Sequence, residues 1–143
     1  MSEFCYTPPR SPVEIIYKDQ SIVVVNKPAG LLSVPGKPQS HFDCMFSRLQ
    51  KEVFGIRVVH RLDLDTSGVM IFARTPSAQA NLGKQFEARE IKKIYLAKVS
   101  GLVEKDSDII KLPITIDWPN RPKQKICFEN GRMASTKYLV LER

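Results

Sequence analysis

The segment 60–68 contains side chains that could carry out acid–base or nucleophilic chemistry. Asp63 lies two residues after Arg61 and two residues before Asp65. A neighbouring guanidinium favours the ionised form of a carboxylate, which is then available as a nucleophile. Polar segments that connect strands often hold catalytic groups. Residue types alone therefore make Asp63 a candidate catalytic carboxylate.

Three residues that shape the loop follow at Thr66, Ser67 and Gly68. The hydroxyls can fix a turn through hydrogen bonds to the backbone, and glycine permits a positive φ or the close approach of a ligand. Spacing alone leaves three interpretations open. The carboxylates could cap a turn, form a glycosidase-like pair, or supply one nucleophile with a companion arginine. A pair at i and i+2 would point to opposite sides of an extended chain.

The elements that must position this segment are short. Aliphatic runs predict a strand on each side of it, with a hairpin earlier in the chain over 13–18 and 22–26. Apolar residues at spacings of three and four predict a helix over 41–54 that packs Phe42 and Phe54 in the core. Thr75 and Pro76 suit the start of a second helix, whose core face would be Ala78, Leu82 and Phe86.

Further strands are expected over 90–100, 109–116 and 135–142, and strands therefore outnumber helices. Most connections are too short for parallel crossovers. We therefore expect an α+β fold with a mainly antiparallel or mixed sheet and flanking helices. The proline-rich residues 1–12 predict a flexible N-terminal tail, and residues 13–143 a single domain.

Composition points to an anionic partner. The 143 residues include 22 lysines and arginines against 15 acids, a net charge of +7. Arg121, Lys123 and Lys125 lie in a proline-stiffened loop beside Trp118, where cations could contact phosphates and the indole could stack on a base. A solvated loop with Trp118 in the core is the alternative.

Metal, membrane and export are not indicated. The three cysteines Cys5, Cys44 and Cys127 have no metal-binding spacing, so we expect reduced thiols in a cytoplasmic protein. The longest aliphatic run, 22–25, is far too short to span a bilayer, and the N-terminus has no apolar core of a signal peptide.

The nine residues 60–68, HRLDLDTSG, resemble the HRLD-x-x-TSG signature of the RluA-type pseudouridine synthases. Residues 26–31, NKPAGL, resemble the N-K-P-x-G-L loop of that family, and residues 93–101 resemble its K-x-Y-x-A-x-V-x-G strand. Residues 117–125 resemble a loop of the RluA subgroup, whose members act on ribosomal and transfer RNA. The similarity extends over residues 13–142.

The resemblance implies that a uridine in an RNA stem-loop is isomerised to pseudouridine, without cofactor or metal. It assigns the catalytic carboxylate to Asp63, as nucleophile or base, and an active-site tyrosine to Tyr95. Arg61 would fill the stack after the target base flips out, because chemistry at C1′ and C5 requires an unstacked base. His60, Arg61, Arg121, Lys123 and Lys125 are then the expected RNA contacts.

The family's catalytic domain continues beyond the strand that resembles 135–142. Its G-R-x-H-Q-L-R segment, whose second arginine pairs with the catalytic aspartate, has no counterpart in these residues. We therefore expect residues 13–143 to be the N-terminal portion of the catalytic domain. The alternative function is an RNA-binding remnant that lacks catalytic activity.

Overall fold

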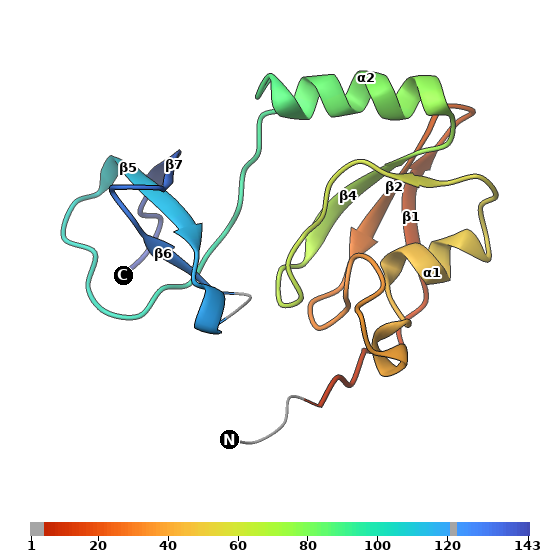
Figure 1. Cartoon of the computed structure of the whole chain (residues 1–143), viewed down its shortest axis with the longest axis horizontal. Coiled ribbons are helices and arrows are strands. Elements are labelled where there is room, and N and C mark those ends of the chain that lie inside the picture. The colour runs from red at the N-terminus through yellow and green to blue at the C-terminus, as the bar shows by residue number, and fades with distance from the viewer. Residues whose placement is uncertain (1–4, 121–122) are drawn as a thin grey trace. The chain divides into compact units, whose positions relative to one another are not determined.

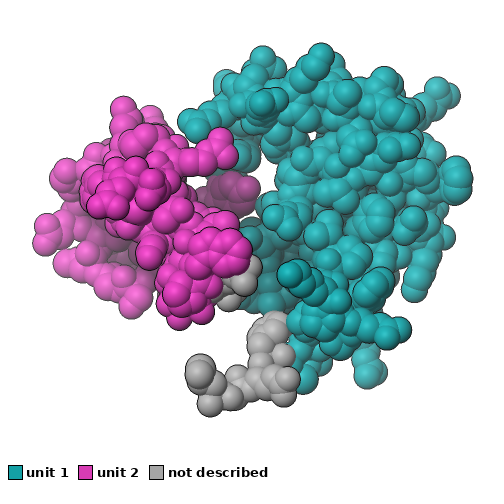
Figure 2. All heavy atoms as spheres, viewed as in Figure 1, with its two compact units in different colours: residues 1–94 teal, residues 95–143 magenta. Residues whose placement is uncertain are grey.

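The chain folds into two compact units, residues 1–94 and 95–143 (Figure 2). The computed structural model describes residues 5–120 and 123–143. The first unit holds a four-stranded sheet in the order β1-β2-β4-β3, and the second holds a three-stranded sheet in the order β6-β5-β7. All strand pairs are antiparallel, which confirms the predicted α+β class. No helix in the described ranges is long and apolar enough to cross a membrane.

The sheet of the first unit is built on the predicted hairpin. Its strands are β1 (Glu14–Lys18), β2 (Ile22–Lys27), β3 (Arg57–Val58) and β4 (Gly68–Ala73). The Asp19 carboxylate fixes the β1–β2 turn by accepting hydrogen bonds from the amides of Ser21 and Ile22 at 2.7 and 2.8 Å. Strand β2 then pairs with β4 from Ile22–Ala73 to Lys27–Gly68.

The first helix is shorter than the sequence predicts. A 3₁₀ turn, η1 (Gln39–His41), is followed by α1 (Met45–Gln50), not by one helix over 41–54. Cys44 has extended backbone angles and caps α1, because its thiol accepts from the Ser47 amide. Phe42 and Phe54, predicted to be in the core, lie outside this helix and are 56% and 94% exposed.

The second helix begins where the sequence predicts. Helix α2 (Pro76–Glu87) follows Thr75, whose hydroxyl accepts from the Ala78 amide at 3.1 Å. Its predicted core face is only half-buried. The core itself lies between the sheet and α1 (Figure 1). Its buried members are Val23, Val25, Leu31, Met45, Leu49, Val53, Ile56, Leu62, Met70 and Phe72.

The N-terminal segment is irregular, as expected, but it is not loose. Among residues 5–12, the carbonyls of Pro9 and Ser11 accept hydrogen bonds from the Arg48 guanidinium on α1. Tyr6 bonds to two further loops of the same unit. These contacts do not fit the prediction of a flexible tail for the part that the structure describes.

The second unit is a small antiparallel sheet. It consists of β5 (Ser107–Ile116), the 3₁₀ turn η2 (Trp118–Asn120), β6 (Gln124–Ile126) and β7 (Arg132–Leu139). Two of its strands were predicted, although β7 begins three residues before the predicted Ser135. The third prediction, a strand over 90–100, is wrong, because these residues form an irregular segment. Ile94 and Leu96 there are 97% and 87% exposed, and no described strand pairs with this segment to stabilise it.

Candidate active site

The polar segment predicted from the sequence forms the connection between β3 and β4. Asp63 and Arg61 are both exposed at its surface. The Thr66 amide donates to the Asp63 carbonyl at 3.2 Å, which closes a turn after Asp63. The Asp63 carboxylate accepts no hydrogen bond and forms no ion pair with any residue in the described ranges. Its backbone is therefore structured while its carboxylate faces solvent.

The residue before Asp63 is held by one buried hydroxyl. Ser33 is only 4% exposed, and its Oγ accepts from the Leu62 amide at 3.0 Å. The same hydroxyl donates to the Leu62 carbonyl at 2.5 Å. Leu62 packs in the core. Both backbone groups of Leu62 are thus satisfied by a single side chain from another loop.

The residue after Asp63 is held by a buried lysine and a glycine. Lys27 is fully buried, and its Nζ donates to the carbonyls of Leu64 at 3.2 Å, Leu31 at 2.6 Å and Pro28 at 3.1 Å. The Gly30 amide also donates to the Leu64 carbonyl, at 2.9 Å. Hydrogen bonds from residues 27–33 therefore hold the backbone on both sides of Asp63.

The buried ammonium also sets the local electrostatics. Burial lowers the pKa of Lys27, and the negative charges of Asp65 and Asp63 oppose this shift. Three carbonyl oxygens solvate the ammonium in place of water, which is what a buried charge requires. The buried ammonium therefore interacts electrostatically with both carboxylates of the loop.

His60 holds the beginning of the loop to the sheet. Its Nε2 accepts a hydrogen bond from the Ile71 amide at 3.0 Å, and its ring stacks on Phe86 with centroids 4.7 Å apart. Burial, with a smaller contribution from the charge of Lys93, lowers the pKa of His60. The geometry gives His60 a structural role, and its contact with RNA stays a prediction.

The loop ends at Gly68. This residue has φ +121°, a conformation that favours glycine, and begins β4 opposite Lys27. A side chain at this position would be strained by the backbone alone, since no atom lies within 4 Å of the place of its Cβ. Ser67 is exposed and Thr66 is half-buried.

The remaining predicted site residues belong to the second unit. Tyr95 is its first residue and is 59% exposed. Lys123 and Lys125 are exposed, and Arg121 lies outside the described residues. Because Asp63 belongs to the first unit, its joint action with Tyr95 stays a prediction.

The loop around Lys123 and Lys125 is shaped by Asp117. The Asp117 carboxylate accepts from Asn120 Nδ2 at 2.8 Å and lies 4.0 Å from Lys125 Nζ, while the Asp117 amide donates to the Lys123 carbonyl at 2.9 Å. Trp118 is 66% exposed, so its alternative placement in the core is wrong.

The structure holds no candidate metal centre in the ranges it describes. No group of three or more His, Cys, Asp or Glu side chains comes together there, and the three cysteines are free thiols.

Lys27 and Ser33, which hold the loop of Asp63, were not among the site residues predicted from the sequence. The alternation of β2 could have revealed Lys27, because Val23, Val25 and Lys27 share one face and the two valines face the core. A lysine in register with core valines indicates a buried ammonium that needs carbonyl partners. No comparable signal distinguishes Ser33 from other serines.

This sequence is similar to proteins of a known family. A family model described as RNA pseudouridylate synthase matches residues 21–143. The chain is 52% identical over 139 residues to the dual-specificity RNA pseudouridine synthase RluA of Vibrio vulnificus, covering 96% of this chain and 56% of that protein. It is 48% identical to the protein of the same name from Escherichia coli, over 96% of this chain and 63% of the relative. The chain thus spans little more than half the length of these relatives.

Two solved structures are similar in fold to this chain. The human RNA pseudouridylate synthase domain containing 1 protein superposes with a TM-score of 0.74 at 25% identity, over 95% of this chain and 56% of the other. The human domain containing 4 protein superposes with a TM-score of 0.61 at 21% identity, over 90% and 53%, and shares the fold. The family match over residues 21–143 shows that the chain belongs to the RNA pseudouridylate synthase family.

Proposed function

We propose that this chain converts a uridine in RNA to pseudouridine, with Asp63 as the catalytic carboxylate. One observation carries the proposal. The backbone is held at Leu62 by Ser33 and at Leu64 by Lys27 and Gly30, while the carboxylate between them has no hydrogen-bond or ion-pair partner among the described residues. A fixed backbone that presents an unengaged carboxylate to solvent is suited to a reacting group.

The proposed reaction is an isomerisation in which no atom of the uridine is lost. The N1–C1′ bond breaks, the uracil turns, a C5–C1′ bond forms, and the proton displaced from C5 is balanced by one gained at N1. Asp63 acts on the ribose as nucleophile or base. The target base must leave the stack for this chemistry. Arg61, which is exposed in the same loop as Asp63, is proposed to fill the vacated position, and Tyr95 is proposed to pack on the uracil.

The proposed substrate is a stem-loop of ribosomal or transfer RNA in the cytoplasm, with no cofactor or metal. The net charge of +7 favours a polyanion. The exposed Lys123 and Lys125 are suited to contact phosphates, and Arg121 is proposed to join them. The names of the bacterial relatives, dual-specificity RNA pseudouridine synthase, support more than one RNA target.

The test uses two matched variants of neighbouring carboxylates, Asp63→Asn and Asp65→Asn. Each is incubated with unmodified ribosomal and transfer RNA stem-loops, pseudouridine is mapped by carbodiimide primer extension, and RNA affinity is measured separately. We expect a pseudouridine stop with the unaltered chain and with Asp65→Asn, and none with Asp63→Asn, at similar RNA affinity.

Other outcomes decide between the alternatives. Loss of the stop in both variants would favour the carboxylate pair over a single catalytic aspartate. RNA binding by the unaltered chain without any stop would overturn the proposed activity in favour of an RNA-binding function.

A further inference from the structure

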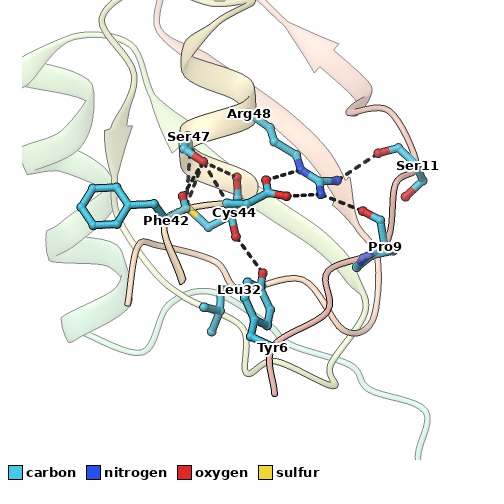
Figure 3. A network of polar contacts seen from close by, with 9 residues as sticks. Tyr6, Pro9, Ser11, Leu32, Phe42, Cys44, Ser47 and Arg48 are labelled. Atoms are coloured by element: carbon cyan, nitrogen blue, oxygen red, sulfur yellow. Dashed lines mark hydrogen bonds and ion pairs between the residues drawn. The ribbon is translucent and has the colours of Figure 1, made fainter. Parts of the chain in front are cut away.

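The N-terminal segment 5–12 is joined to the loop of Asp63 by a continuous series of hydrogen bonds. Tyr6 is the first link (Figure 3). Its hydroxyl donates to the Asp43 carbonyl at 2.7 Å and accepts from the Leu32 amide at 3.0 Å. One phenol therefore joins the loop before α1 to the loop that follows β2.

A ring contact and partial burial hold the Tyr6 phenol in this position. Its ring meets the edge of His41 with centroids 5.2 Å apart. Burial is the main cause that raises the pKa of Tyr6 above its ordinary value, so the hydroxyl keeps the proton that it donates to Asp43. The N-terminal segment also lies close to the next loop, since Pro9 Cδ is 3.7 Å from the place where a Cβ of Gly30 would be.

Arg48 secures the same segment from the side of α1 (Figure 3). Its Nε and Nη2 each lie 2.7 Å from an oxygen of the Asp43 carboxylate, in a bidentate pair. Its Nη2 also donates to the Pro9 carbonyl at 2.7 Å and its Nη1 to the Ser11 carbonyl at 3.1 Å. The planar guanidinium, 17% exposed, thus binds the segment and the Asp43 loop together.

The series continues from Leu32 to the site. The carbonyls of Leu32 and Ser33 accept from the first amides of α1, at Met45 and Phe46, at 2.8 and 3.1 Å. The next bonds are those of the Ser33 hydroxyl to both backbone groups of Leu62. Because Leu62 directly precedes Asp63, the series that begins at Tyr6 ends at the candidate catalytic aspartate.

We propose that residues 5–12 are a strap that positions the Asp63 loop, with Tyr6 as a positioning residue acting through Leu32, Ser33 and Leu62. The inference rests on the proposed function in assigning the reaction to Asp63. Tyr6 touches no reacting atom. Its hydroxyl sets where residues 32–33 lie, and these fix the peptide groups on either side of Leu62.

The test compares Tyr6→Phe with Tyr17→Phe in the full chain. Tyr17 is the matched control, because among residues 5–120 and 123–143 its hydroxyl bonds only the exposed Asp19 at the β1–β2 turn. Amide hydrogen exchange is followed by NMR at Leu32, Leu62 and strand β2. In Tyr6→Phe we expect the Leu32 and Leu62 amides to exchange about tenfold faster, with β2 unchanged, because the variant loses both hydrogen bonds of the Tyr6 hydroxyl. Tyr17→Phe should leave all of them unchanged.

Turnover gives the readout that a purely structural contact would not change. We expect Tyr6→Phe to lower kcat for pseudouridine formation while KM for the stem-loop stays the same. If Tyr6→Phe fails to fold, Arg48→Lys replaces it in the exchange experiment. This variant keeps the charge but loses the planar fork, and we expect it to accelerate hydrogen exchange at the same amides.

Two results would overturn the strap: unchanged exchange at Leu62 in the folded variants, or faster exchange at Leu62 with unchanged kcat. If the unaltered chain forms no pseudouridine, the proposed function fails, and the exchange data still decide whether the strap holds the loop.

Discussion

The Ser33 hydroxyl bonds both backbone groups of Leu62, accepting from the amide at 3.0 Å and donating to the carbonyl at 2.5 Å. Two bonds to one residue fix the peptide planes before and after it. The second of these planes carries the amide of Asp63. A single buried side chain therefore sets the orientation at which the candidate catalytic residue begins.

Ser33→Ala removes both bonds and leaves the Leu62 amide and carbonyl without their partner in a buried region. We expect the free energy of unfolding to fall by about 1–3 kcal/mol, the cost of an unsatisfied buried polar group. Urea unfolding measures it. Ser40→Ala, on the exposed turn η1, is the control and should change the value by less than about 0.5 kcal/mol. Equal stability of the two variants would contradict this role of Ser33.

Lys27→Met keeps the length of the side chain but removes the ammonium. The Leu31 carbonyl then loses its bond at 2.6 Å, while the Leu64 carbonyl keeps the bond from Gly30. We expect a loss of about 1–3 kcal/mol in the free energy of unfolding, partly offset because no charge is buried any longer. The exposed Lys37→Met is the control in the same urea experiment. A variant as stable as the unaltered chain would show that Gly30 and Ser33 hold the loop without Lys27.

Local signals predicted much of the first unit. The cap at Thr75 and the hairpin over 13–18 and 22–26 each act through neighbouring residues, and each is found in the structure. The strand expected over 90–100 is wrong because its residue types suit a strand but its backbone finds no partner among the described strands. The prediction of Phe54 in the core is wrong for another reason, because the helix ends at Gln50 and the chain beyond it buries Val53 but exposes Phe54.

The candidate site was also predicted from the sequence only in part. The motif identified Asp63 and Arg61, but the residues that hold the loop lie far earlier in the sequence. Lys27 is 37 residues from Leu64, and Ser33 is 29 residues from Leu62. Such pairings depend on the antiparallel register of β2 and β4, which brings Lys27 opposite Gly68. Composition and spacing within a short window cannot supply that register.

Binding to phosphates predicts a salt-dependent affinity. Replacing Lys123 and Lys125 together by Gln should weaken RNA binding and reduce the slope of log affinity against log salt by about 0.7–0.9 for each phosphate that is no longer neutralised. The pair of the exposed Lys125 with Asp117, 4.0 Å apart, contributes little stability, so the fold should persist. Lys18→Gln, on the edge strand β1, is the control. An unchanged slope in the double variant would exclude these lysines from the RNA interface.

We expect the free energy of unfolding to fall in weak acid because of His60. Its pKa is lowered in the folded chain from an ordinary value of 6.5, mainly by burial. Below pH 6.5 the unfolded chain therefore binds the proton more readily than the folded chain, and the free energy of unfolding falls as the pH drops from 6.5 towards the folded-state pKa. Protonation also removes the lone pair of Nε2 that accepts from Ile71.

Urea unfolding of the unaltered chain and of His60→Gln at about pH 7.5 and about pH 5.0 isolates this contribution from other titrating groups. The unaltered chain should be the more stable of the two at the higher pH, because glutamine loses the stacking on Phe86. The difference between them should shrink at the lower pH, where only the histidine has to be charged. A difference that is the same at both pH values would mean that His60 titrates alike in the folded and unfolded chain, against the burial of its ring.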